Sequence, residues 1–146
     1  MNGPVCQTKF LGVNIDYQAQ WNAHLESVAL KLNKSLFLLR RLADNISGKA
    51  LKSAYFATFH SQLSYAVLVW GHAPNSKYLF GLQRKAFKVV DGVDFRDDCI
   101  ESFKQLGILT LPCLYLLENL LYVVGNIDLF ATHGDVHTYQ TRSKTN

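Results

Sequence analysis

A pair of adjacent carboxylates is the arrangement in this sequence that comes closest to a catalytic motif. Asp97 and Asp98 follow an aromatic residue and an arginine, and paired carboxylates at the tip of a β-hairpin can hold Mg²⁺ ions for phosphoryl transfer. Residues 90–94, however, do not form the apolar strand that such a hairpin needs. Asp98 and Glu101 are instead spaced like the capping pair of a helix. We therefore predict no catalytic residue and interpret both aspartates as helix caps.

No other group of side chains predicts a metal site or a nucleophile. His133 and His137 are four residues apart, but their segment has no helical pattern that would align them. The three cysteines, Cys6, Cys99 and Cys113, are too widely spaced for a disulfide framework or a Cys-x-x-Cys metal pair. We expect them to be reduced, partly buried thiols of an intracellular protein, nuclear or cytoplasmic. The sequence predicts no metal and no cofactor.

Contact with phosphate groups is the other chemistry that the residues could perform. Basic side chains recur at steps of three and four residues in two segments that read as amphipathic helices, about 20–43 and about 77–90. In the first segment His24 and Ser27 begin the line that the basic side chains continue. Cations on the polar side of a helix can bind a sugar-phosphate backbone without reading bases. Our candidate phosphate contacts are Lys31, Lys34, Arg40, Arg41, Arg84, Lys85 and Lys88. The alternative is an ordinary solvated face, which any soluble helix shows.

Composition and pattern predict one mainly α-helical domain. The chain has 146 residues, 49% of them hydrophobic and 18% charged, with a net charge of +4. This is enough for one hydrophobic core, with an apolar excess that favours a partner. We expect a strand over 8–15, then a bundle of about four to five helices. Ser53 to Ser76 carries no charged residue, but polar side chains interrupt it, so we predict no membrane span.

The predicted helices have recognisable ends. Ser47 can cap a second helix over about 48–69, and a short helix is expected to end near Leu106. Thr110 and Pro112 favour the start of a fifth helix that runs to about Val124. Its leucines cover more than one side, which indicates either deep burial or packing against something absent from this chain. We therefore expect a possible protein partner over residues 106–130, and a polar, frayed tail over 131–146.

Several short motifs resemble one known family in their order and spacing. Lys9 to Asp16 reads Lys-Phe-Leu-Gly-Val-Asn-Ile-Asp, and Trp21-Asn22-Ala23-His24 follows it. Farther along are Leu63-Ser64-Tyr65, Trp70-Gly71 and Leu82-Gln83-Arg84-Lys85-Ala86. Together they resemble the reverse transcriptase of non-LTR (LINE/jockey-like) retrotransposons, from its primer-grip strand through its thumb. The segment Phe95 to Asp98 is similar to the Phe/Tyr-x-Asp-Asp signature of that family, but it follows the Phe-Leu-Gly strand, whereas the family motif precedes it.

The resemblance implies a truncated piece of an RNA-directed DNA polymerase. Residues 1–16 would be a remnant of the primer-grip strand, with Phe10, Leu11 and Gly12 as primer-grip-like residues, and 17–130 would be a helical, thumb-like domain. The catalytic fingers and palm are missing, so we expect no catalysis by this chain. Mg²⁺ is implied only for the complete parent enzyme.

The resemblance favours sequence-independent binding of an RNA–DNA or DNA duplex as the function. The alternatives are a helical protein-interaction module and a decayed element product without nucleic-acid function.

Overall fold

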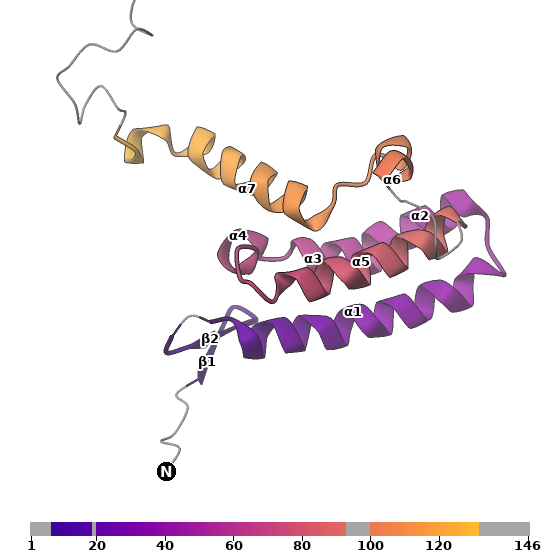
Figure 1. Ribbon diagram of the computed structural model, residues 1–146, viewed down its shortest axis with the longest axis horizontal. Coiled ribbons are helices and arrows are strands. Elements are labelled where there is room, and N and C mark those ends of the chain that lie inside the picture. The colour runs from indigo at the N-terminus through magenta and orange to yellow at the C-terminus, as the bar shows by residue number, and fades with distance from the viewer. Residues whose placement is uncertain (1–6, 19, 93–99, 132–146) are drawn as a thin grey trace, which may run out of the picture.

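The chain folds into a helical bundle preceded by a small β-hairpin (Figure 1). The computed structural model describes residues 7–18, 20–92 and 100–131. The mainly α-helical class predicted from the sequence is confirmed. Within the described ranges, no helix is long and apolar enough to cross a membrane. The predicted polar tail and the Asp97–Asp98 pair lie outside the described residues.

The first element is a hairpin, so the prediction of one strand over 8–15 was wrong. β1 (Gln7–Phe10) and β2 (Val13–Asp16) pair antiparallel, with Phe10 opposite Val13. The two residues between them, Leu11 and Gly12, both have positive φ, 45° and 81°. This is the geometry of a two-residue type I′ turn, which matches the twist of the strands. Asn-Gly is the usual sequence for such a turn, and with leucine in the first position the turn could not be recognised from the sequence.

The longest helix, α1 (Asn22–Ala43), agrees with the predicted bounds. Its apolar side is a seam in which Leu32 and Leu39 are fully buried. α5 (Ser76–Asp91) likewise agrees with the prediction, and it ends where Gly92 takes a φ of 73°. A glycine at this position accepts the left-handed conformation that closes many helices.

The predicted helix over 48–69 is interrupted. Ser47 caps α2 (Gly48–Tyr55) as expected, since the Ala50 N–H donates to Ser47 Oγ at 3.4 Å. A π-helical segment, η1 (Phe56–His60), and a single turn, α3 (Ser61–Ser64), follow. The chain then breaks at Ala66, whose φ is 53°, and resumes as α4 (Val67–Trp70). The buried indole of Trp70 donates from Nε1 to the Tyr65 carbonyl at 3.0 Å, which stabilises the break.

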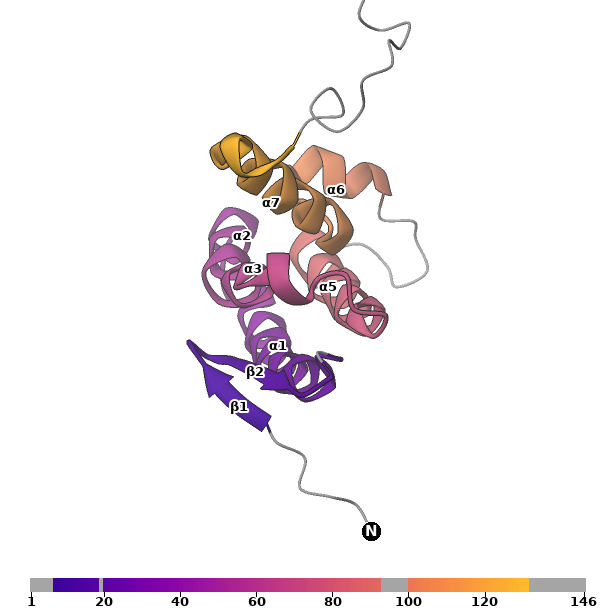
Figure 2. The same cartoon turned by 90° about the vertical axis from the view of Figure 1, so that its left-hand side faces the viewer.

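The C-terminal described part contains two helices. α6 (Ile100–Leu106) is short, and α7 (Leu111–Gly125) begins at the predicted cap, where the Cys113 N–H donates to Thr110 Oγ1 at 3.4 Å. A 3-10 turn, η2 (Ile127–Leu129), follows α7. Seen end-on, α1, the α2–α3 segment and α5 form a three-helix bundle, and α7 lies on the side of the bundle remote from α1 (Figure 2).

The side chain of Gln83 joins three parts of this bundle. Fully buried on α5, it donates from Nε2 to the Leu109 carbonyl at 2.8 Å and to the Tyr55 hydroxyl at 3.2 Å. Its Oε1 accepts the Leu111 N–H at 2.7 Å. One amide thus links α2, α5 and the turn that starts α7. Burial raises the pKa of Tyr55 to about 12, so its hydroxyl stays protonated at neutral pH.

Replacing Gln83 by leucine should destabilise the fold strongly. The Gln83→Leu variant keeps the side-chain volume but leaves the buried Leu111 N–H and its neighbours without a partner, at about 1–3 kcal/mol for each group. We expect the free energy of unfolding, measured by urea denaturation, to fall by about 2–4 kcal/mol. Gln105→Leu, on the exposed side of α6, is the matched control and should change it by less than about 0.5 kcal/mol. Equal effects of the two substitutions would contradict the role of Gln83.

Candidate nucleic-acid interface

Three of the seven predicted phosphate contacts lie along one side of α1. Lys31, Lys34 and Arg41 are exposed, and at 3.6 residues per turn they fall within roughly 80° of one another around the helix. They extend over about 15 Å of the helix axis, the rise of roughly four nucleotides on one strand at 3.4 Å each. We call these three residues the cationic flank. Leu38, which is also exposed, interrupts it.

No carboxylate neutralises the charges of the cationic flank within the described residues. In the part of the chain that the structure describes, none of its three residues forms an ion pair. The one carboxylate on α1, Glu26, is five residues before Lys31 and therefore roughly 140° away from it around the helix. The Arg41 guanidinium lies 5.5 Å from the centre of the Phe37 ring, which restrains it by a cation–π contact. Arg41 also occupies the last turn of α1, where a cation interacts favourably with the helix dipole.

Three other predicted contacts are exposed but lie elsewhere. Arg40 is nine residues from Lys31 and therefore roughly 180° away around α1. Arg84 and Lys85 belong to α5, which packs against α1 on the side remote from the cationic flank. A groove of about 600 Å³ marks this contact, lined by Asn22, Leu25, Glu26, Ala29, Pro74, Asn75, Lys77 and Tyr78. The structure thus does not bring the exposed candidates together on one continuous surface.

Two residues of the predicted cationic lines belong to the interior. Lys88 is only 7% exposed and already has an interaction partner, so it does not offer a free cation to a ligand. His24 is 3% exposed and contacts the Trp70 ring at 6.0 Å between centroids. The prediction that both residues lie on the solvent side of their helices was wrong, because residue spacing cannot show which neighbouring elements cover a helix face.

His24 connects the cationic flank to the hairpin. Its Nδ1 accepts the Asn14 N–H of β2 at 3.3 Å, so the neutral ring carries its proton on Nε2. His24 and Lys31 are seven residues apart, close to two full turns, and lie on the same side of α1. Burial, and secondarily the charge of Lys31, holds the pKa of His24 below its usual 6.5. The hairpin and the cationic flank therefore share one side of the molecule.

The primer-grip-like residues form the tip of the hairpin. Phe10 and Leu11 are exposed, at 62% and 73%. The Tyr65 hydroxyl donates to the Leu11 carbonyl and fixes the tip against the chain break before α4. Leucine is a poor choice for a positive φ and gains nothing from burial here. A residue in an unfavourable backbone conformation that gains no stability from it is expected at a binding surface.

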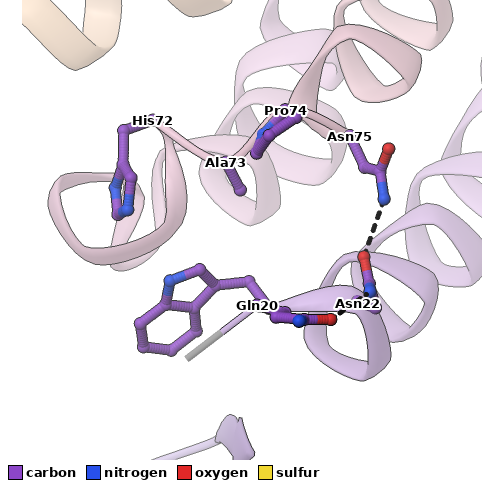
Figure 3. Close-up of a pocket in the computed structure, with 7 residues that line it drawn as sticks. Gln20, Asn22, His72, Ala73, Pro74 and Asn75 are labelled. Carbon is purple, nitrogen blue, oxygen red and sulfur yellow. Dashed lines mark hydrogen bonds between the residues drawn. The ribbon is translucent and has the colours of Figure 1, made fainter. Parts of the chain in front are cut away.

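A second, uncharged pocket lies at the start of α1. It has a volume of about 340 Å³ and is lined by Gln20, Trp21, Asn22, His72, Ala73, Pro74 and Asn75. In Figure 3, Asn75 and Asn22 point toward each other, and Asn75 Nδ2 donates to Asn22 Oδ1 at 2.7 Å. This bond joins the starts of α1 and α5. The lining contains no charged residue, so the pocket adds no phosphate contact.

Within the described ranges, no group of three or more metal-binding side chains occurs. His133, His137, Cys6 and Cys99 lie outside these ranges. Cys113 is exposed on α7 and is not the partly buried thiol that we expected.

For the leucines of α7 the sequence left two alternatives, deep burial or packing against a partner. Only Leu111 and Leu114 are buried on this helix. The other leucines are 39–64% exposed, so of the two predicted alternatives, deep burial is wrong.

Comparison of the chain with known protein families, with curated proteins and with solved structures gives no match. The resemblance to retrotransposon reverse transcriptases therefore stays a prediction from the residues and motifs quoted above.

The depressed pKa of His24 predicts a loss of stability in mild acid. A histidine whose folded pKa lies below 6.5 stabilises the fold fully above that pH, and this contribution is lost as the pH falls. The unfolding free energy should therefore decrease between pH 7.5 and pH 5.5 in urea titrations. Because burial also lowers the pKa of His60, His24→Gln should reduce this decrease without abolishing it. An unchanged decrease in His24→Gln would show that His24 is not responsible.

Proposed function

We propose that this chain binds an RNA–DNA or DNA duplex without reading its sequence, and that it performs no catalysis by itself. The observation that carries the proposal is the cationic flank: three exposed, unpaired cations aligned on the side of a rigid helix. Each can contact a backbone phosphate and release condensed counterions, which is the main source of sequence-independent affinity.

The position of the hairpin supports the same surface. Its second strand, β2, is bonded to His24 at the start of α1, and its exposed tip, with Phe10 and Leu11, lies against Tyr65. In this proposal the flank lies along the phosphates and the tip contacts the end of the duplex. The arrangement agrees with the thumb and primer grip implied by the resemblance to reverse transcriptases.

Reversal of charge on the cationic flank provides the test. The double variant Lys31→Glu, Lys34→Glu should bind a labelled RNA–DNA duplex at least tenfold more weakly, because two phosphate contacts are lost. The slope of log affinity against log salt concentration should become less steep by about 2. Fluorescence anisotropy at several salt concentrations measures both quantities.

The matched control makes the same change of net charge elsewhere. Arg84→Glu with Lys85→Glu reverses two exposed cations on α5. We expect its duplex affinity to stay within about threefold of the original and its salt slope to be nearly unchanged. If both double variants lose affinity equally, only net charge matters, and the assignment to α1 is wrong. No measurable binding by the original protein would overturn the proposed function.

A further inference from the structure

The exposed side chains of α7 form a continuous apolar strip. It consists of Leu116, Leu117, Leu120, Leu121 and Val124, continued by Ile127 in η2, and all six are 39–72% exposed. At 3.6 residues per turn the five residues on α7 cover one side of the helix, whereas Asn119 lies on the other side. Leu121 is exposed although it nearly follows the line of buried Leu114, because the second half of α7 extends past the bundle (Figure 1).

The strip contains the spacing of a coiled-coil seam. Together with Cys113, which precedes the strip on α7, Leu117, Leu120 and Val124 follow one another at steps of four, three and four residues, and Ile127 comes three residues later in η2. Such a repeat places its members in one narrow line that packs against a second helix. The strip is therefore shaped for a helix rather than for a flat surface or a small ligand.

The charges near the strip exclude two kinds of occupant. From Leu111 to Phe130 the chain has no lysine or arginine, and its charged residues are Glu118 and Asp128. A nucleic acid would be repelled, and helices that lie on membranes usually carry basic residues on their polar face. Residues 132–146 do not supply a matching seam either, since Val136 and Tyr139 are their only large apolar residues.

We propose that a second copy of this chain covers the strip, with the two α7 helices packed antiparallel about a two-fold axis. The copy itself provides a helix with the required seam, and a two-fold axis pairs the same surface with itself. With Tyr122, Leu129 and Phe130 included, the exposed apolar side chains offer on the order of 600 Å² in each copy. A pair would bury roughly 1,200 Å², the lower end of the range for specific interfaces.

The first experiment measures the mass of the protein in solution without nucleic acid, by sedimentation equilibrium at 1–100 µM. We expect a reversible monomer–dimer equilibrium. Leu120→Lys places a charge in the middle of the seam and should weaken dimerisation at least tenfold. Since Leu120 is exposed in the monomer, its circular dichroism should not change. Leu30→Lys, on α1, is the matched control, because Leu30 is similarly exposed at 66%, and its dimerisation should stay within twofold.

A second experiment tests the antiparallel direction. In a full-length background with Cys6→Ser and Cys99→Ser, Ile127→Cys places a thiol at the end of the seam opposite Cys113. Diamide oxidises two thiols to one disulfide and takes up their two electrons and two protons. Antiparallel pairing brings Cys113 of one copy to position 127 of the other, so a covalent dimer should form. The same background with Ile127 retained should not cross-link, because the two Cys113 side chains lie at opposite ends of the interface.

The outcomes separate this proposal from the alternatives. A monomer at every concentration, aggregates of undefined size, or a dimer unaffected by Leu120→Lys would overturn the interface. Cross-linking of Cys113 without the added thiol would overturn the antiparallel arrangement. A monomer that instead binds neutral lipid vesicles through α7 would assign the strip to a membrane. The measurements use no duplex, so they stand independently of the proposed nucleic-acid binding.

Discussion

The buried amide of Gln83 is the interaction on which the arrangement of the helices depends. An apolar core holds helices together but is tolerant of small rotations and shifts, because its contacts have no direction. The amide has directed partners on three elements: the Tyr55 hydroxyl, the Leu109 carbonyl and the Leu111 N–H. An unmade hydrogen bond at this depth is costly. The angle at which α7 leaves the bundle is therefore set by the bundle itself, and the second half of α7 extends beyond it.

The packing of the apolar helix faces determines which cations are exposed and can contact phosphates. α1 buries its leucines against α5 and the α2–α3 segment, so any cation on its outer side is held on a rigid support. Ser35 strengthens this packing, since its Oγ donates to the Thr58 carbonyl of η1 at 3.1 Å. A rigid support matters for phosphate contacts because the charges do not have to be ordered on binding, which removes part of the entropic cost.

Local signals were enough to predict much of this fold and part of the candidate site. The ends of α1 and α5 and the caps at Ser47 and Thr110 follow from short-range chemistry, and they were predicted well. The hairpin and the break at Ala66 were not, because neither Leu11 nor Ala66 is a residue that normally indicates a left-handed backbone.

The position of each cation required tertiary information. The sequence shows that Lys88 shares a side of α5 with Arg84, but elements packed on that side bury Lys88 and leave Arg84 exposed. Likewise, the leucines of α7 have the same pattern whether the helix is buried or extends past the bundle. Its buried start and exposed end follow from the contacts of Gln83, which connect residues 28 positions apart.

The two proposed surfaces lie on opposite sides of the bundle and are physically compatible. α1 and the hairpin occupy one side, and α7 the other (Figure 2). Antiparallel pairing through α7 would therefore leave both copies of the cationic flank uncovered and facing outward. Two weak, sequence-independent sites on one particle bind a long polyanion more tightly than either does alone, provided that the duplex can reach both. With only three cations on each flank, such pairing would compensate for the small number of phosphate contacts that a single copy can make.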